Sequence, residues 1–344
     1  MCSVRGTARL LCASIVPPDS EEAQPRVVAV RPGPGSRADS APVRFLGVRW
    51  HDGTMKIDLH THSSASDGTQ PPAEVVRSAA EAGLDVVALT DHDTTAGWAS
   101  ATEAAHRYGI ALVPGTEVSC QTDDGISVHL LSYLQDPAGS ALLEVMERAR
   151  ASRRSRAQRM VEMIGRDYPI SWDTVLVQVS EDATVGRPHI ADALVAAGVA
   201  ATRSEAFDTV LHPRSGYYVG HYAPDPVTAV RLVREAGGVP VIAHPMASLR
   251  GRTVGRRMLE EMIDAGLAGL EIAHRDNPPE ARVRLSELAA ERDLIVTGSS
   301  DYHGAGKPNE LGENLTSEQS LRRILAEATS GTRMVEPRTR EAGV

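Results

Sequence analysis

The feature that most constrains the fold is a repeated alternation of short apolar runs with longer stretches of helical periodicity, which begins at residue 55. The short runs are rich in Val, Ile, Leu and Ala, as expected for strands buried on both faces. They span residues 55–59, 85–90, 110–117, 127–133, 239–243, 269–273 and 294–298. This order predicts a parallel sheet with right-handed crossovers, and about seven strands favour closure into a barrel.

Helices are predicted between most of these strands. They cover residues 72–82, 97–108, 226–236, 256–265 and 278–291. Four of the helical stretches end at a glycine, as helix C-termini often do. The capping signals support the helices independently of the apolar pattern, so the chain is predicted to be an α/β protein.

Residues 137–225 interrupt the alternation. A basic helix over 144–164 is followed by further helical and loop segments without a strand–helix repeat. We therefore predict a barrel formed by 55–136 and 226–335, with 137–225 as a mostly helical insertion domain. The basic helix carries six arginines, at 148, 150, 153, 154, 156 and 159. They could bind a polyanion, but we favour a solvated helix face.

Residues 1–54 differ from the rest of the chain. They are rich in Pro, Arg, Gly and Ser and show no sustained periodicity, which predicts a disordered leader. Met55 stands immediately before the first strand, so the hypothesis is that Met55 is the natural start and the leader is not native.

Composition excludes several classes of protein. The net charge of −9 argues against a general polyanion binder, such as a protein that binds duplex DNA. It leaves a small anionic substrate open, because bound divalent cations can reverse the local field. Three cysteines without Cys-x-x-Cys spacing fit a reducing compartment, the cytoplasm. No run approaches the roughly 18 apolar residues of a membrane span. The oligomeric state is left open.

Potential metal ligands fall at the ends of the predicted strands. They are His60, His62, Asp67, His92, Glu117, His129, His244, Asp301 and His303. In barrels of this kind the C-terminal strand ends form the catalytic face, so we expect all nine side chains to meet at one mouth. Burying so many imidazoles and carboxylates without a cation would cost several kcal/mol. The pattern therefore predicts a metal centre.

Imidazole and carboxylate ligands without thiolate suit Mn²⁺, Fe²⁺ or Zn²⁺, and the residue types alone do not choose among them. Nine ligands with a shared carboxylate indicate two or three divalent ions, with Mn²⁺ the expected one. Such a cluster favours phosphoryl chemistry, because one ion activates water and its neighbours neutralise phosphate charge. A phosphate-binding Gly-rich loop with Lys and a Gly-x-Ser-x-Gly motif are both absent from the sequence, which argues against a nucleotide-driven kinase and a serine hydrolase.

In combination the motifs resemble those of the PHP (polymerase and histidinol phosphatase) superfamily. They are Asp58-Leu-His-Thr-His62, Ser66-Asp-Gly68, Leu89-Thr-Asp-His-Asp93, Gly115-Thr-Glu117, His129-Leu-Leu131, Ala243-His-Pro245 and Gly298-Ser-Ser-Asp-Tyr-His-Gly304. The resemblance covers about residues 55–310. It is strongest to the bacterial subgroup that removes the 3′-phosphate of nucleoside 3′,5′-bisphosphates and trims short RNA from its 5′ end. An Arg-x-His motif of that subgroup is matched by Arg187-Pro-His189.

The resemblance implies a distorted seven-stranded (β/α)7 barrel and three ligand sets. One metal would take His60, His62, Glu117 and Asp301, the second Glu117, His129 and His244, and the third Asp67, His92 and His303. It also implies in-line attack on phosphorus by a metal-activated hydroxide, with Arg187 and His189 holding phosphate oxygens.

The expected substrate is a small phosphorylated nucleotide or a short oligoribonucleotide. The alternatives are a histidinol-phosphate-type or general phosphomonoesterase, and a non-catalytic metal-binding module.

Overall fold

The computed structural model describes residues 55–180, 183–248 and 251–338, and the predicted leader lies outside the described residues. All seven predicted strands are confirmed. They are β1 (Ile57–Asp58), β2 (Val86–Leu89), β3 (Ala111–Gln121), β4 (Ser127–Tyr133), β5 (Val239–Ile242), β6 (Gly269–Ala273) and β7 (Ile295–Gly298). They form one sheet in the order of the sequence.

The sheet is a nearly closed barrel, as predicted. The segments that follow its first and last strands link them by single hydrogen bonds. The amide of His62 donates to the carbonyl oxygen of Tyr302 over 2.8 Å. The amide of Thr316 donates to the carbonyl oxygen of Ile57 over 2.9 Å. The two ends of the sheet therefore approach each other without forming a regular ladder.

The prediction that every strand is parallel is wrong for β4. This strand is antiparallel to both β3 and β5, whereas the other neighbouring pairs are parallel. The reason is the connection between β3 and β4, residues 122–126, which is a tight hairpin closed by the amide of Thr122 on the carbonyl oxygen of Ile126. A parallel crossover needs about a dozen residues or more, so five cannot supply one.

Alternation along the strands separates two apolar layers. On β2, Val86 and Ala88 face the barrel interior, while Val87 and Leu89 belong to the cluster that packs against the outer helices. Burial on both faces explains why these runs are apolar throughout. On β2 the polar residues begin at Thr90, directly after the strand, which places them at the mouth.

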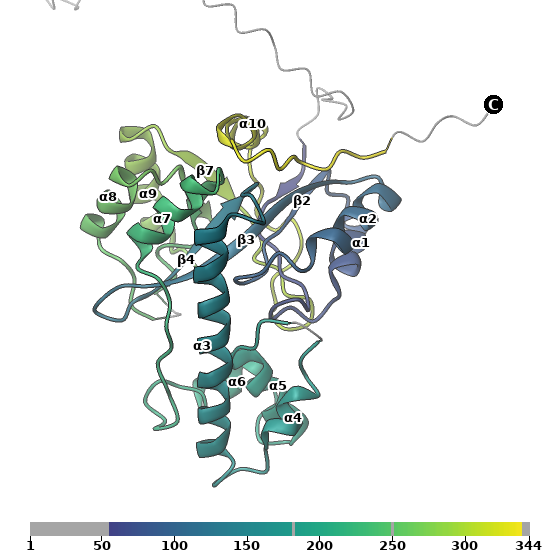
Figure 1. The fold of residues 1–344 in the computed structure, drawn as a ribbon, viewed down its shortest axis with the longest axis vertical. Helices are drawn as coiled ribbons and strands as arrows, with labels where there is room; N and C mark the ends of the chain where they lie inside the picture. The colour runs from purple at the N-terminus through teal and green to yellow at the C-terminus, as the bar shows by residue number, and fades with distance from the viewer. Residues whose placement is uncertain (1–54, 181–182, 249–250, 339–344) are drawn as a thin grey trace, which may run out of the picture. The chain divides into compact units, whose positions relative to one another are not determined.

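Helices cover the barrel from outside (Figure 1). The helices α1 (Pro72–Glu81) and α2 (Trp98–Tyr108) pack on β2 and β3. The helices α7 (Pro226–Glu235), α8 (Arg256–Asp264) and α9 (Pro279–Glu291) bury their apolar sides against β4, β5 and β6. A last helix, α10 (Glu318–Glu327), contributes Leu321 and Ile324 to the interior cluster. None of the described helices combines the length and the apolar character that crossing a bilayer requires.

Between β4 and β5 the described residues form five helices, and four of them precede α7: α3 (Ser140–Ile164), α4 (Trp172–Leu176), α5 (Arg187–Ala196) and α6 (Arg203–Asp208). Figure 1 shows α4, α5 and α6 gathered along one part of α3, where they share an apolar cluster of their own. The described residues nevertheless belong to one compact unit, so the domain boundaries near 137 and 225 stay a prediction.

The prediction of a solvated arginine face on α3 is only partly right. Arg148, Arg154 and Arg159 are exposed, but Arg153 and Arg156 are buried, at 9% and 3% exposure. The two buried arginines lie one turn apart on the side of α3 that meets the barrel, where Arg153 contacts β3. Their burial depends on this tertiary contact, which charge patterning along one helix does not reveal.

Candidate metal centre

The structure brings all nine predicted ligands together at one mouth of the barrel. The segment after β1 carries His60, His62 and Asp67, and the segment after β7 carries Asp301 and His303. His92, Glu117, His129 and His244 come from the four elements between them. Eight of the nine are buried, and His129 is partly exposed. Side chains more than 240 positions apart therefore share one site.

His129 reaches this mouth for a different reason from the one predicted. It was expected at the C-terminal end of a parallel strand, but it lies near the beginning of β4. Because β4 is antiparallel to β3, its beginning is level with the C-terminal end of β3, and His129 lies directly opposite Ser119. The reversal of β4 preserves the convergence of the ligands.

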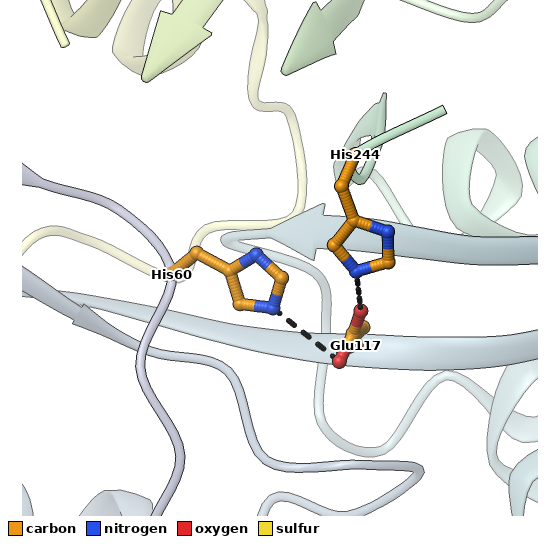
Figure 2. A group of neighbouring side chains, drawn as sticks. All are labelled: His60, Glu117 and His244. Atoms are coloured by element: carbon orange, nitrogen blue, oxygen red, sulfur yellow. Dashed lines mark ion pairs between the residues drawn. The ribbon is translucent and has the colours of Figure 1, made fainter. Parts of the chain in front are cut away.

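Glu117 lies at the centre of the cluster. Its Oε1 is 2.8 Å from Nδ1 of His129 and 3.4 Å from Nε2 of His244. Three other imidazoles lie against its Oε2: Nε2 of His60 at 3.3 Å, Nε2 of His62 at 3.0 Å and Nδ1 of His92 at 3.3 Å. Figure 2 shows Glu117 rising from its strand with one oxygen toward His60 and the other toward His244. Such a carboxylate is placed to bridge two cations.

Two further subgroups flank Glu117. Oδ1 of Asp301 is 3.5 Å from Nε2 of His60 and 3.5 Å from Nε2 of His62. On the other side, Oδ1 of Asp67 is 3.2 Å from Nε2 of His303 and its Oδ2 is 3.8 Å from Nε2 of His92. These distances are compatible with the three ligand sets that the family resemblance implies, and the assignment of each residue to one ion stays a proposal.

The donor atoms fit divalent cations. Four groups of three side chains have ligand atoms within 4.8 Å of one another: His60, Glu117 and His244; His60, His62 and Asp301; His62, Asp67 and His92; and His92, Glu117 and His129. Two buried imidazole nitrogens, Nδ1 of His92 and Nε2 of His303, lie 3.3 and 3.2 Å from carboxylate oxygens of Glu117 and Asp67 but make no hydrogen bond with any described residue. A buried polar atom without a partner costs free energy, and a bound cation would satisfy both nitrogens. The cluster can therefore bind metal.

The charge states of Glu117 and His303 suit a cation as well. Burial alone would raise the pKa of Glu117, but the imidazoles of His129, His92 and His60 hold it well below its usual range. Burial, the Lys307 ammonium and His62 lower the pKa of His303 to about 4. The carboxylate is thus ionised and this imidazole neutral, as metal ligation requires.

His60 departs from this pattern. Burial lowers its pKa, yet the surrounding carboxylates of Glu117, Glu271 and Asp301 raise that pKa well above the usual value. Three carboxylates around one imidazole create a strongly negative environment that attracts a proton. The same environment favours a divalent cation, whose binding would displace the proton.

The backbone at the mouth is strained at three ligand-bearing or neighbouring positions. Asp93, His244 and Asp301 have φ values of 54°, 29° and 55°, which non-glycine residues rarely adopt. Such conformations cost about 1–3 kcal/mol each and persist only where surrounding contacts impose them. Gly68 of the Ser-Asp-Gly motif avoids a clash instead, since a Cβ there would lie 2.4 Å from the carbonyl oxygen of His62.

Glu271 supports the cluster from behind. Its Oε1 is 3.0 Å from Nδ1 of His60 and accepts a hydrogen bond from the hydroxyl of Ser299, while its Oε2 accepts from the amide of His244 over 2.8 Å. Carboxylates that hold the outer nitrogen of a ligating imidazole fix its ring orientation and tautomer. Glu271 therefore orients the ring of His60 and fixes the backbone that carries His244.

His274 is also part of the mouth. It is fully buried, its ring centroid lies 5.0 Å from that of His244, and its Nε2 is 3.5 Å from Oδ2 of Asp301. Lys307 donates to the same oxygen over 2.9 Å, so it contacts a candidate ligand rather than only solvent. The position of His274 directly after β6 was a signal for its place at the mouth.

The two aspartates beside His92 serve other elements. Asp91 accepts hydrogen bonds from the amide and hydroxyl of Ser63 and from the hydroxyl of Ser66, which fixes the loop that carries His62 and Asp67. Asp93 accepts from the amide and hydroxyl of Ser119. These contacts tie the β1 loop and β3 to the β2 end.

Arg187 and His189, predicted to hold phosphate, lie in the first turn of α5. The guanidinium of Arg187 lies over the rings of Phe207 and Tyr218, at 5.1 and 5.6 Å from their centroids. Nδ1 of His189 accepts from the amide of Gly186 over 3.1 Å, which caps the helix. The cap gives His189 a structural contact, and its role toward phosphate stays a proposal.

The segment before α5 is fastened to the mouth. The amide of Thr184 donates to the carbonyl oxygen of Ala65 over 3.0 Å, and its hydroxyl donates to that of His92 over 2.9 Å. Arg203 of α6 donates to the carbonyl oxygen of Asp67 over 3.0 Å. The α3–α6 region therefore contacts two ligand-bearing loops, which the sequence gave no reason to expect of Thr184 or Arg203.

Comparison with known proteins gives the same family as the motifs. The PHP domain profile matches residues 58–172. A 5′-3′ exoribonuclease of Haemophilus influenzae is 33% identical over 264 residues, which cover 76% of this chain and 95% of that protein. A 3′,5′-nucleoside bisphosphate phosphatase of Chromobacterium violaceum is 33% identical over 252 residues, covering 73% of this chain and 88% of that protein.

A third relative has a different activity at a similar distance. It is a phosphoribosyl 1,2-cyclic phosphate 1,2-diphosphodiesterase of Eggerthella lenta, 32% identical over 261 residues, which cover 73% of this chain and 95% of that protein. Sequence identity to these three relatives therefore does not decide which substrate this chain uses.

Among solved structures, a protein of Bifidobacterium adolescentis superposes with a TM-score of 0.78 and 47% sequence identity over 80% of this chain and 97% of that protein. It is provisionally described as a metal-dependent phosphoesterase. The match extends over nearly the whole neighbour, so the shared fold includes the segments that carry the candidate ligands.

Proposed function

Because the chain belongs to the PHP family of metal-dependent phosphoesterases, we propose that its reaction is the hydrolysis of a nucleotide phosphate monoester. The substrate we propose is a nucleoside 3′,5′-bisphosphate, which would lose its 3′-phosphate. The observation that carries the proposal is the cluster of candidate ligands. Four groups of three side chains share one site, and two of these groups include Glu117. The relative from Chromobacterium violaceum supports the choice of substrate.

The proposed resident ions are two or three Mn²⁺, held by the nine residues predicted from the sequence. Ions bound there would lower the pKa of a water molecule and neutralise charge on the phosphate. The chain's own contribution is to hold the ligands in place: Glu271 orients the ring of His60 and fixes the backbone at His244, and Asp91 fixes the loop of His62. Arg187 and His189 are proposed to bind phosphate oxygens.

Trimming of short RNA from its 5′ end is the second candidate. It is favoured by the Haemophilus influenzae relative, whose name states that activity. Both reactions cleave an ester at the 3′ oxygen of a nucleotide, so one active site can serve both. A cytoplasmic location, proposed from the cysteine content, would give access to either substrate.

A substrate panel tests the proposal. Purified protein stripped of metal and reloaded with Mn²⁺ is assayed on adenosine 3′,5′-bisphosphate, adenosine 5′-monophosphate, histidinol phosphate, phosphoribosyl 1,2-cyclic phosphate and a short 5′-phosphorylated RNA. The proposal expects the highest kcat/KM for the bisphosphate and no turnover after chelation. A higher kcat/KM for histidinol phosphate or for the cyclic phosphate would reject the proposed substrate.

A further inference from the structure

Positive charge gathers beside the metal centre in a place that the ligands do not explain. We define the arginine cluster as Arg153 and Arg156 of α3, Arg187 of α5, and His221, which follows the α3–α6 region. NH1 of Arg156 lies 3.2 Å from Nδ1 of His221. A Cβ placed on Gly186, the residue before Arg187, would lie 3.8 Å from NH1 of Arg153. Besides burial, the charges of Arg153 and Arg187 lower the pKa of Arg156, and the charge of Arg153 lowers the pKa of Arg187. The three guanidiniums, from two helices, therefore lie near one another.

The arginine cluster adjoins the candidate ligands. Arg153 donates from NH2 to the hydroxyl of Ser119. Ser119 lies directly opposite His129 in the β3–β4 ladder. Side chains at directly opposite positions of an antiparallel pair have Cβ atoms about 4.5–5.5 Å apart. The cluster and the ligand pair of His129 and Glu117 therefore lie within the length of one small molecule.

The cluster carries more positive than negative charge. Nε of Arg153 is 3.2 Å from Oδ2 of Asp93, so one guanidinium has a carboxylate partner. Among the described residues no carboxylate lies within ion-pair distance of Arg156 or Arg187. Three guanidiniums and one carboxylate leave two positive charges uncompensated. Burying a charge without a counter-charge costs free energy. Proteins retain such a charge where a ligand supplies the counter-charge.

Unsatisfied donors point to the same conclusion. Arg156 is only 3% exposed, and its Nε has no hydrogen-bond partner among the described residues. The buried Nε2 of His221 is also without one. Burial and the charges of Arg153 and Arg187 lower the pKa of Arg156 to about 9, as expected for a guanidinium held beside like charges. An anion among these groups would meet both donors.

We propose that the arginine cluster binds the second phosphate of the substrate, the one that is not hydrolysed. This inference rests on the proposed function, because it assumes that the scissile phosphate lies at the metal centre. Guanidinium is the group best matched to phosphate, since its planar fork donates two parallel hydrogen bonds. The second phosphate is the 5′-phosphate in a nucleoside 3′,5′-bisphosphate and in the terminal nucleotide of a 5′-phosphorylated RNA.

The test compares two substrates that differ by this phosphate. The kcat/KM values for adenosine 3′,5′-bisphosphate and adenosine 3′-monophosphate are measured for the wild-type protein and for Arg156→Met. The ratio of the two values is expected to fall by about 10–100-fold in the variant, the effect of one charge-assisted hydrogen bond. Arg156→Lys, which keeps the charge but loses the fork, should restore part of the ratio.

Arg154→Met is the matched control. Arg154 lies on the same helix, is exposed and stacks over Trp172 at 5.4 Å from the ring centroid. Its loss should leave the ratio as in the wild-type protein. An unchanged ratio in Arg156→Met, or an equal fall in Arg154→Met, would overturn the proposal.

A binding measurement separates this inference from the proposed function. Wild-type protein in excess chelator is heated with and without adenosine 5′-monophosphate, which carries only the second phosphate. The nucleotide should raise the melting temperature of the wild-type and Arg154→Met proteins but not that of Arg156→Met. If no substrate is turned over but this pattern holds, the anion site stands and the proposed reaction fails. If the nucleotide stabilises all three proteins equally, the anion site fails.

Discussion

Replacement of Glu117 by Gln is the sharpest perturbation of the metal centre. The amide has the size and shape of the carboxylate but no charge, so packing is retained. Glu117 is the sole carboxylate in two of the four candidate ligand groups, and its two oxygens lie within 3.4 Å of five imidazoles. The substitution therefore leaves those two groups with neutral ligands only.

The magnitude follows from linkage between metal binding and folding. A ligand present at 100 times its dissociation constant stabilises the folded state by about 2.7 kcal/mol. Even carboxylates that only support a ligand change metal affinity by about 10–100-fold when removed. A loss of about 100-fold would bring the same Mn²⁺ concentration near the dissociation constant, where the stabilisation is only about 0.4 kcal/mol. At about 2 °C per kcal/mol for a domain of this size, the Mn²⁺-induced rise in melting temperature should fall from about 5 °C to about 1 °C.

The assay is thermal unfolding by circular dichroism, with a Mn²⁺ titration on chelator-treated protein. Glu103→Gln, an exposed position on α2, is the matched control and should retain the full Mn²⁺ effect. The far-ultraviolet spectrum of Glu117→Gln should equal that of the wild-type protein. An undiminished Mn²⁺-induced rise in Glu117→Gln would refute the view that Glu117 holds cations.

Three further outcomes are expected. His62→Ala and Asp301→Ala should each abolish turnover of adenosine 3′,5′-bisphosphate while preserving the far-ultraviolet spectrum, and a near-normal kcat in either would count against the assigned centre. Glu271→Gln should weaken Mn²⁺ binding by about 10–100-fold without removing a ligand, because it loosens His60 and His244; calorimetric titration with Mn²⁺ measures this, and unchanged affinity would return Glu271 to a packing role. Chelation should remove all phosphatase activity, and Mn²⁺ should restore at least as much as Zn²⁺; a higher rate with Zn²⁺ would argue against manganese.

The gathering of the nine ligands could be predicted because each ligand is fixed by local sequence. A strand end is visible from the apolar run before it, and the topology of a barrel brings the ends to one edge. No long-range information was needed for His60, His92 or Asp301. The seven strands and their helices were predictable for the same reason.

The direction of β4 was missed although the sequence contained its signal. Asp124-Gly125 lies in the nine residues between the predicted strands 110–117 and 127–133, a segment too short for a parallel crossover, and Gly125 adopts a φ of 82°. The regular alternation elsewhere in the chain favoured a parallel strand. The burial of His274 had a weaker signal, its position directly after a strand.

The burial of Arg153 and Arg156 had a signal in helical periodicity rather than in charge. Both lie on the side of α3 that also carries the buried Met146, Ala149 and Met160, at spacings of three and four residues, whereas the other arginines of the helix are mostly exposed. What buries Arg153 is a hydrogen bond to Ser119, 34 residues earlier in the chain, and an ion pair with Asp93. Contacts of this range depend on how α3 meets the barrel, which the sequence alone leaves open.

The distribution of positive charge bears on the choice between the two candidate substrates. Affinity for long RNA grows with the number of phosphates contacted by an exposed basic surface. Here the net charge is −9, and the exposed Arg148 and Arg154 of α3 lie over the rings of Tyr222 and Trp172. The two uncompensated positive charges are instead inside, next to the ligands. Such an arrangement recognises one additional phosphate close to the scissile ester, so any action on RNA should depend on the terminal nucleotide rather than on the length of the strand.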